Sequence, residues 1–339
     1  MTIKEIARIC GVSRGTVDRV VNRRGKVKPQ TEEMILRVIA EHGYTKNTVA
    51  QALTVKKKEP VIGVILCSEG NSFFDDVIDG FRRAEEDLRD YGVTLILKTM
   101  AGHSVTRQLE LIDELRSQIS ALVIQPINSR RIADSLLALK EAGVPTVTVN
   151  TDIENSCRCC YVGSDYERGG AVAAGMMALV TGGRANLGII GGVDTLMGHV
   201  LRQKGFEEHL RAVCPQIRFL GSALAQDDPE RAYRATRQML DEHPQIDAMF
   251  IVAACVHDVC RAIIDAGREH DIRVVAYDDV PSTREMMRRG LVRAVVCQQP
   301  FEQGYRAAHE AFEMILSGQM TENRMLIMEN QIKIAENID

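Results

Sequence analysis

The 339-residue sequence has no apolar run approaching the roughly 18 residues that a membrane-spanning helix needs. Its N-terminus also lacks the apolar core of a secretory signal. The nine cysteines are odd in number and scattered, unlike a disulfide framework. Together these absences predict a cytoplasmic protein that does not associate with membranes and whose thiols are mostly reduced.

The sequence also lacks the common catalytic and nucleotide-binding motifs. No G-x-x-x-x-G-K-[ST], H-E-x-x-H or G-x-S-x-G occurs, and GIIGGV at 188–193 does not have the G-x-G-x-x-G spacing. Asp278 and Asp279 are adjacent and diverge in an extended or turn segment, whereas glycoside hydrolysis needs two carboxylates across one bond. We therefore predict that the protein is not an enzyme.

Three of the cysteines form a group, Cys157, Cys159 and Cys160. C-x-C-C is not a standard zinc spacing and would need a fourth ligand. Thiols buried as small hydrophobic side chains are the favoured interpretation. A redox or metal sensor built on this group stays open as an alternative, and otherwise we predict no metal and no cofactor.

The sequence carries its strongest pattern at the N-terminus. Residues 2–22, TIKEIARICGVSRGTVDRVVN, predict two short helices joined by a tight turn. Thr2 is placed to cap the first helix, whose apolar side chains recur at the spacing of one helical face. Gly11 ends that helix, and Ser13 caps a second helix with valines on its inner side. This pattern is typical of a helix-turn-helix.

A third amphipathic helix is predicted between Thr31, as its N-cap, and Gly43. The charge around this small helical head is uneven. Residues 1–58 contain 13 Lys and Arg against 5 Asp and Glu, a net charge of +8, and the rest of the chain carries −12. A basic head on an acidic body predicts that the head binds a polyanion.

Residues 2–22 closely resemble the opening signature of the lactose-repressor-like (LacI/GalR) family of bacterial transcription regulators. In that family the second helix enters the major groove, which by match places Arg14, Gly15 and Arg19 at the base edges. The arginine fork can bond O6 and N7 of guanine together. The DNA-contacting residues that the resemblance implies in the head are Thr2, Ser13, Arg14, Gly15, Thr16, Asp18, Arg19 and Asn22.

Asp18 departs from the family pattern, in which a small hydroxyl residue is usual at this position. A carboxylate there would repel the DNA phosphates. Asp18 therefore either accepts a hydrogen bond from a cytosine amino group or pairs with Arg14 or another nearby arginine, and we favour the pairing.

Residues 47–58, NTVAQALTVKKK, resemble the hinge of the same family, a short helix that orders on the operator. By that resemblance Asn47 caps the helix, Ala50 packs at the approach of two hinges, and Leu53 enters the minor groove and kinks the DNA. An ordinary core leucine is the alternative for Leu53. The predicted domains are a DNA-binding head (1–46), a hinge helix with its linker (47–60), and an effector-binding and dimerisation domain (61–339).

From residue 61 onward, short β-branched runs alternate with amphipathic helical stretches, which predicts parallel sheets flanked by helices. The expected strands are 61–67, 94–98, 121–125, 146–150, 185–190, 248–252, 273–277 and 294–298. Their number favours two lobes. This part resembles the periplasmic-binding-protein fold of two doubly wound α/β lobes, with expected lobes of about 61–161 plus 292–325 and about 162–291 plus 326–339.

In doubly wound sheets, ligands bind beyond the carboxyl ends of the strands. Amides, carboxylates, an arginine and phenyl rings follow the expected strands, and such groups suit a polyhydroxy ring. With the resemblance to ribose-type binding proteins, they predict an effector site of Asn71, Phe73, Phe74, Gln125, Asn150, Asp152, Arg202, Asp278 and Gln298. After the strand ending at Val252, where relatives usually have Asn-Asp, this chain reads AACVHD. The usual ligand-binding asparagine is therefore missing or displaced.

These features predict a sequence-specific DNA-binding repressor whose operator affinity is set by a sugar or sugar-like molecule bound between two lobes. One small head contacts too few base pairs for specificity, so we expect a homodimer on palindromic double-stranded operator DNA. No heptad tail follows QIKIAENID, which favours a dimer over a tethered tetramer. A DNA-binding redox or metal sensor is one alternative, and a solute-binding or enzymatic body with an incidental basic head is another.

Overall fold

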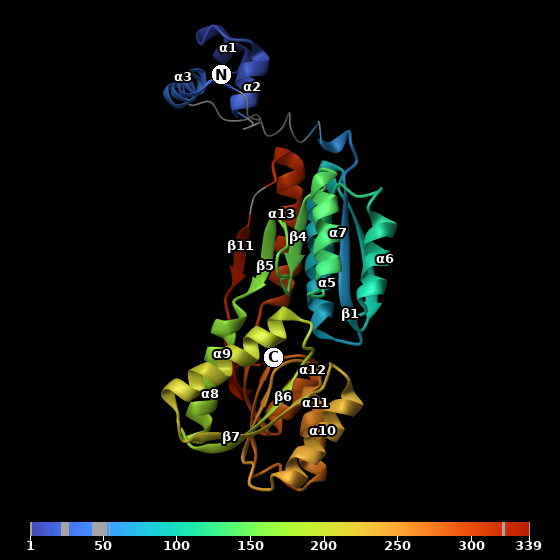
Figure 1. Cartoon of the computed structure of the whole chain (residues 1–339), viewed down its shortest axis with the longest axis vertical. Coiled ribbons are helices and arrows are strands. Elements are labelled where there is room, and N and C mark those ends of the chain that lie inside the picture. The colour runs from blue at the N-terminus through green and yellow to red at the C-terminus, as the bar shows by residue number, and fades with distance from the viewer. Residues whose placement is uncertain (1, 22–26, 43–52, 54, 321–322, 339) are drawn as a thin grey trace.

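The computed structural model of the chain describes residues 2–21, 27–42, 53, 55–320 and 323–338. It contains a small helical head and two α/β lobes that follow one another along the long axis (Figure 1). We call the lobe next to the head the N-lobe and the other one the C-lobe.

The head consists of α1 (Ile3–Ile9), α2 (Arg14–Val21) and α3 (Pro29–Glu41). Thr2 caps α1 as predicted, and it forms a capping box with Glu5. The Glu5 backbone N–H donates to Thr2 Oγ1 at 3.3 Å, and the Thr2 backbone N donates to the Glu5 carboxylate at 2.7 Å. Ser13 caps α2, because its hydroxyl accepts from the Thr16 backbone N–H at 3.1 Å.

The three helices of the head enclose one apolar core. Ile6, Val17 and Ile35, one from each helix, are fully buried. The predicted start of the third helix at Thr31 was wrong, because α3 begins at Pro29. Proline has its φ angle already set for the first turn and needs no N–H there, so the helix starts earlier than the threonine suggested.

The N-lobe sheet has the order β11-β5-β4-β3-β1-β2, and all its strand pairs are parallel. Its strands are β1 (Val61–Glu69), β2 (Thr94–Ala101), β3 (Ala121–Ile124), β4 (Thr146–Val149), β5 (Cys160–Ser164) and β11 (Arg324–Met328). One face packs on α5 (Phe73–Leu88) and α13 (Pro300–Ser317), the other on α6 (Val105–Leu115) and α7 (Arg130–Glu141). A 3-10 turn, η1 (Arg89–Tyr91), follows α5.

The C-lobe sheet repeats this plan in the order β12-β10-β9-β8-β6-β7, with only β12 antiparallel to its neighbour among the described strands. Its strands are β6 (Ala185–Gly191), β7 (Ile217–Leu224), β8 (Ala248–Ile251), β9 (Arg273–Tyr277), β10 (Val292–Cys297) and β12 (Gln331–Lys333). One face packs on α8 (Tyr166–Thr181) and α9 (Met197–Val213). The other packs on α10 (Pro229–Glu242), α11 (Val256–Asp265) and α12 (Pro281–Arg288), and a 3-10 turn, η2 (Ala335–Asn337), lies near the C-terminus.

The eight predicted strands are all present, as β1, β2, β3, β4, β6, β8, β9 and β10. The sequence interpretation missed β5, β7, β11 and β12. The two-lobed parallel α/β fold is confirmed, but the expected lobe boundaries were a few residues too early. Strand β5 and strand β11 stay in the N-lobe sheet, and β10 stays in the C-lobe sheet, because their hydrogen-bonded neighbours lie there.

Three segments therefore cross between the lobes, after β5, after β10 and after β11. Amide side chains connect these crossings to one another. Gln299, in a left-handed conformation with φ 54°, donates from Nε2 to the Glu329 carbonyl at 3.0 Å. Asn330 Nδ2 donates to the Asp165 carbonyl at 3.4 Å. Lobe movement must bend all three crossings together.

Each lobe contains one helix pair that crosses at glycines. In the N-lobe, a β-carbon on Gly80 or Gly304 would overlap the backbone of the opposite helix in the α5–α13 pair. In the C-lobe, a β-carbon on Gly170 would overlap the backbone carbonyl of Arg202 in α9. Because these positions have no side chain, the helix backbones can touch, and this contact sets the distance between α8 and α9.

Candidate functional site

A cavity of about 420 Å³ lies between the two lobes, at the carboxyl ends of strands from both sheets. The lobes also touch directly at its edge. The Gly198 backbone N–H donates to Thr151 Oγ1 at 3.1 Å, and the Asn128 backbone N–H donates to the Thr195 carbonyl at 3.0 Å. The cleft is the size of a typical small-molecule pocket.

The cavity brings together eight of the nine residues that the sequence predicts as effector-binding. They are Asn71, Phe73, Phe74, Gln125, Asn150, Arg202, Asp278 and Gln298. These residues come from both lobes, so a ligand in the cavity would touch both. That arrangement can couple ligand binding to the angle between the lobes.

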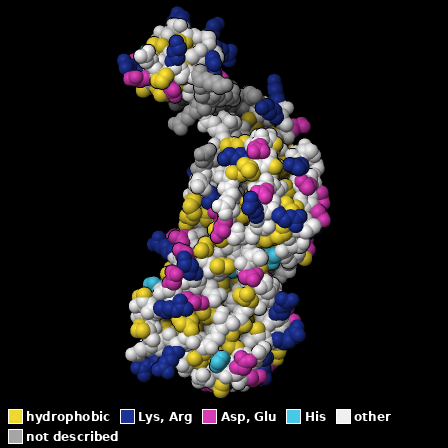
Figure 2. Space-filling view, viewed as in Figure 1, with side chains coloured by type: hydrophobic (Ala, Val, Ile, Leu, Met, Phe, Trp, Pro, Cys, Tyr) yellow, Lys and Arg dark blue, Asp and Glu magenta, His cyan; other side chains and the backbone are white. Residues whose placement is uncertain are grey.

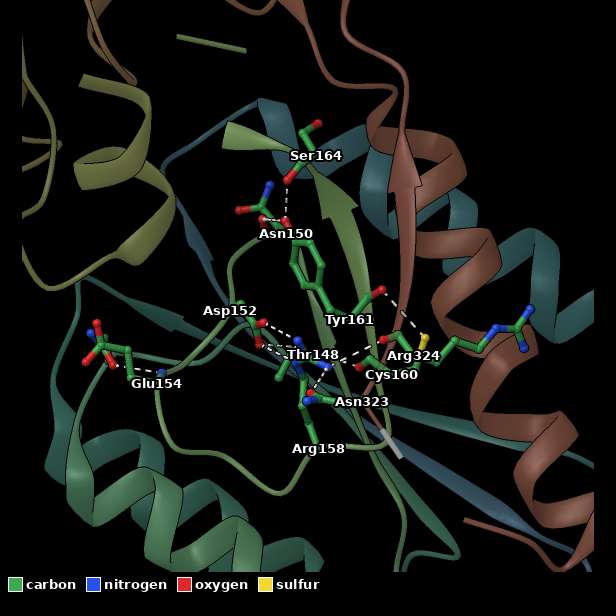
Figure 3. Close-up of polar contacts among 11 residues, drawn as sticks. Thr148, Asn150, Asp152, Glu154, Arg158, Cys160, Tyr161, Ser164, Asn323 and Arg324 are labelled. Carbon is green, nitrogen blue, oxygen red and sulfur yellow. Dashed lines mark hydrogen bonds and ion pairs between the residues drawn. The ribbon is translucent and has the colours of Figure 1, made fainter. Parts of the chain in front are cut away.

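Asp152, the ninth predicted residue, does not line the cavity. Its carboxylate forms a bidentate pair with Arg158, in which the Nε–Oδ1 and Nη2–Oδ2 distances are both 2.6 Å (Figure 3). Thr148 Oγ1 also donates to Asp152 at 2.9 Å, and Arg158 Nη1 donates to Asn323 Oδ1 at 3.2 Å. The loop after Asn150 turns back along the sheet, so Asp152 holds the β4–β5 connection to the start of β11.

The centre of the C-lobe wall is the buried guanidinium of Arg202, whose side chain belongs to α9. Its Nη1 donates to the Val252 carbonyl, and the guanidinium carbon lies 3.5 Å from the centre of the Tyr277 ring. Tyr166 lies on the same guanidinium at 5.1 Å, and its hydroxyl donates to the Asn150 carbonyl. The carbonyl and the aromatic faces stabilise a charge that is shielded from water.

Asp278 follows β9 in a left-handed turn with φ 61°. Gln298 Nε2 donates to Asp278 Oδ2 at 2.8 Å. Burial raises the pKa of Asp278 to about 7, and the nearby charge of Arg202 and the hydrogen bond from Gln298 oppose this rise. The carboxyl group thus sits between its neutral and ionised forms near neutral pH.

The N-lobe wall offers aromatic surface and amides. Phe73 and Phe74 meet edge to face with ring centres 5.1 Å apart, and both are buried. Asn71 Oδ1 accepts from the Phe73 backbone N–H at 3.1 Å. Gln125 Oε1 accepts from the Cys67 backbone N–H at 2.9 Å. These bonds fix the orientation of both amides at the cavity edge.

The sequence interpretation missed several residues that line the cavity, chiefly His103, Tyr166, His199, Asp227 and Tyr277. Asp227 follows β7, a strand that was not predicted, so its position at a strand end went unseen. His199 Nδ1 accepts from the Val193 backbone N–H at 2.9 Å, and burial holds the pKa of His199 well below its usual value. Its Nε2 therefore carries the proton.

After β8, the positions where relatives usually have Asn-Asp present only small side chains to the cavity. Ala253, Ala254 and Cys255 line it there, and Cys255 takes a left-handed conformation with φ 69°. The departure noted in the sequence is therefore part of the cavity wall.

On the head, α2 presents a polar outer side. Ser13, Arg14, Gly15 and Arg19 are exposed, and Arg19 Nε donates to the Gly15 carbonyl at 3.1 Å. Thr16 and Asp18 are half-buried, and Lys and Arg side chains are spread over the head (Figure 2). Asn22, Asn47 and Ala50 lie outside the described residues.

Leu53 has a side chain that is 59% exposed. Among the two interpretations of this leucine, an ordinary core residue does not agree with that exposure. Exposure is compatible with an apolar group held for another surface, as the resemblance implied.

The head and the body each match a known family. The model for "Bacterial regulatory proteins, lacI family" matches residues 2–47, and the model for "Periplasmic binding protein domain" matches residues 62–319. The chain belongs to the lacI family of bacterial regulatory proteins.

Similar proteins agree with this assignment over nearly the whole chain. The HTH-type transcriptional regulator CelR of Thermobifida fusca is 27% identical over 99% of this chain and 97% of its own length. The ribose operon repressor of Haemophilus influenzae is 26% identical, again over 99% of this chain and 98% of its own. The glucose-galactose binding protein GanP of Geobacillus stearothermophilus shares the two-lobed fold, with a TM-score of 0.76 and 22% identity over 82% of this chain and 98% of its own.

This lacI-family protein is thus a DNA-binding transcriptional regulator with a sugar-binding-like effector domain, and its family is not enzymatic. Among the described residues, no helix is long and apolar enough to span a membrane. Within the same residues, no group of three or more His, Cys, Asp or Glu side chains could hold a metal ion.

Two of the three cysteines at 157–160 are core thiols, and Cys157 is half-buried. Cys159 and Cys160 are buried in the N-lobe core. Burial raises the pKa of Cys160 to about 12, so its reactive thiolate form is rare near neutral pH. The packing favours the hydrophobic interpretation over a redox sensor.

Proposed function

We propose that this lacI-family protein is a cytoplasmic repressor whose affinity for its operator is set by a polyhydroxy small molecule bound between the lobes. The cleft carries the proposal, because it gathers eight sequence-predicted polar and aromatic residues from both lobes around one cavity. Two similar proteins, a ribose operon repressor and a glucose-galactose binding protein, support a sugar-like ligand.

The proposed mechanism follows from the three crossing segments. A ligand that binds both walls favours a particular angle between the lobes, and the head lies beyond the far end of the N-lobe (Figure 1). In a two-fold dimer, rotation of the N-lobes changes the distance between the two heads. Operator affinity then shifts by the ligand's differential affinity for the two states, typically about 1–3 kcal/mol.

For the DNA side, we propose that α2 lies in the major groove with Arg14, Gly15 and Arg19 at the base edges. The further proposed contacts are Thr2, Ser13, Thr16, Asp18 and Asn22 in the head, with Asn47, Ala50 and Leu53 in the hinge. Arg14 and Arg19 are exposed on one short helix, as this docking requires.

The DNA proposal is tested by selecting an operator from random DNA with the full chain and then measuring binding of Arg19→Ala. We expect the variant to lose about 1–3 kcal/mol of preference for the operator while its salt-dependent binding to random DNA changes little. Equal losses on both kinds of DNA would contradict a base-contacting role for Arg19.

The effector proposal is tested by a thermal-shift screen of pentoses, hexoses and polyols, followed by operator binding in the presence of each compound that raises the melting temperature. We expect at least one such compound to change operator affinity. Compounds that bind without any change in operator affinity would contradict the coupling.

A further inference from the structure

We propose that the effector is a non-anionic, hydrogen-bond-donating polyhydroxy compound, and that Asp227 is a specificity-determining residue that disfavours phosphorylated and carboxylated sugars. This inference rests on the proposed function, because it concerns the ligand of the same cleft. It follows from the polar atoms of the cavity wall that lack partners and from the balance of charge around them.

Six buried side-chain atoms on the cavity wall have no hydrogen-bond partner among the described residues. They are Arg202 Nε, Asp227 Oδ1, Tyr277 OH, Asp278 Oδ1, Thr283 Oγ1 and Gln298 Oε1. Buried polar groups in native proteins are nearly always paired. All six belong to the walls of one cleft, so a bound molecule is the partner that would satisfy them.

Acceptors dominate this set. Gln298 Oε1 is an acceptor, and so are Asp227 Oδ1 and Asp278 Oδ1 when their carboxylates are ionised. Arg202 Nε is a donor, and the two hydroxyl groups can donate or accept. Gln298 Nε2 donates to Asp278 Oδ2 at 2.8 Å, which leaves Gln298 Oε1 as the acceptor without a partner. A ligand must therefore supply several donors, as hydroxyl and amino groups do and phosphate or carboxylate groups do not.

The charge of the cavity wall points the same way. Four carboxylates line it, those of Glu69, Asp227, Asp258 and Asp278, against one arginine. That arginine, Arg202, is already engaged with the Val252 carbonyl and the Tyr277 ring. An anionic ligand would face this excess of carboxylates across a partly buried cleft, and like charges repel there.

Of the three histidines among the described lining residues, His103 and His199 add little positive charge, and His257 lies 3.7 Å from the Asp258 carboxylate. Burial lowers the pKa of His103 and of His199, which favours their neutral forms. Burial also raises the pKa of Asp227 and Asp278, so a ligand that donates to these carboxylates would restore their charged forms. A ligand that cannot donate would leave them protonated or unpaired.

Asp227 is an acceptor that the sequence did not predict. It stands at the end of β7 with φ 55°, and a hydrogen bond from the Ala254 backbone reaches its carboxylate. Asp227 thus lies beside the stretch where Ala253 and Ala254 replace the polar pair usual in relatives. From the end of the edge strand β7, two positions along the sheet from β8, the carboxylate supplies the polar contact that the alanines cannot make.

The test uses the full chain and matched sets of compounds: a hexose, its hexitol, its hexosamine, its 6-phosphate and its uronic acid, with the corresponding pentose set. Thermal shift finds the binders and calorimetry gives their affinities. We expect binding only by the uncharged or amino-bearing members. Asp227→Asn should weaken the best of them at least about tenfold, because it removes a charge-assisted hydrogen bond. Asp241 is an exposed carboxylate in α10, so Asp241→Asn is the matched control and should bind as the wild type does.

The possible failures are distinguishable. A phosphate or acid that binds more tightly than its uncharged parent overturns this inference but leaves a polyhydroxy effector in place. An unchanged affinity in Asp227→Asn, with an unchanged ligand-free melting temperature, removes the role of Asp227. If no member of any set binds, the proposed effector function itself fails.

Discussion

Among single residues, Asp278 carries a carboxyl group that the cleft buries at a cost in free energy. Its left-handed backbone turn directs a carboxyl group into the wall, where only Gln298 donates to the side chain among the described residues. Loss of water raises the pKa of Asp278 to about 7 despite the nearby Arg202. A ligand-binding site can tolerate such a cost, because the bound ligand supplies the hydrogen bonds that the protein itself does not make.

Asp278 gives a pH dependence with a definite sign. The folded chain holds this proton up to about pH 7, whereas the unfolded chain releases it near pH 4. The folded state therefore binds more protons between these values, and stability falls as pH rises through that window. The amide side chain of the Asp278→Asn variant stays neutral at every pH, so the variant should lack this fall. Its stability relative to the wild type should therefore be greater at pH 8 than at pH 5.

The measurement is the free energy of unfolding of ligand-free wild type and variant at both pH values. Asp241→Asn serves as the control, since its carboxylate is exposed. Parallel pH profiles for wild type and Asp278→Asn would contradict a raised pKa at this residue.

Asp152 provides a second test at the same scale. Its side chain and that of Arg158 are almost fully shielded, with 13% and 7% exposure, so removing one partner leaves a buried charge unpaired. We expect Asp152→Ala to cost about 3–5 kcal/mol of unfolding free energy. Chemical denaturation measures this cost. A stability equal to that of the wild type, combined with lost effector binding, would return Asp152 to the effector site.

At the scale of elements, the crossing of α8 and α9 sets where Arg202 stands. Gly170 in α8 lies against the Arg202 backbone carbonyl, so any side chain there must push α9 away. Gly175, one and a half turns further along the same helix, has open space around the position of a β-carbon. Close packing therefore requires glycine at position 170 but not at position 175.

The two glycines form a matched pair of substitutions. Gly170→Ala should destabilise the protein by at least about 1–3 kcal/mol through overpacking, and it should weaken effector binding by moving Arg202. Gly175→Ala should stabilise it by about 0.5–1 kcal/mol, because alanine is the better helix former. Thermal or chemical unfolding compares them. Equal effects of both substitutions would show that backbone contact at Gly170 does not set the helix spacing.

At the scale of the whole molecule, one head at the end of a long two-lobed body reads few base pairs by itself. We expect the chain to sediment as a dimer at twice its 37.6 kDa mass and to bind a palindromic operator. Deleting one half-site should weaken binding by at least about a hundredfold, because half of the phosphate and base contacts are lost. A monomer that binds full and half operators alike would contradict this assembly.

The helix-turn-helix and the fold class could be predicted from the sequence alone, because both depend on local signals. Capping residues at Thr2 and Ser13 and the helical spacing of the head core are properties of short segments. The eight strands predicted from short apolar, β-branched runs are present for the same reason. The start of α3 shows the limit of such signals, because Pro29 and Thr31 are both suited to begin a helix and only two positions separate them.

Which side chains meet depends on how the two sheets and their helices pack. Strand β7 is mostly half-buried or exposed and Ile217 is its only β-branched residue, so its end and Asp227 could not be placed from the sequence. Asp152 follows a strand as a cleft residue would, yet the direction of its loop pairs it with Arg158. The cleft joins strand ends that are far apart in the chain, and only the packing of two sheets fixes which of their polar groups remain without partners.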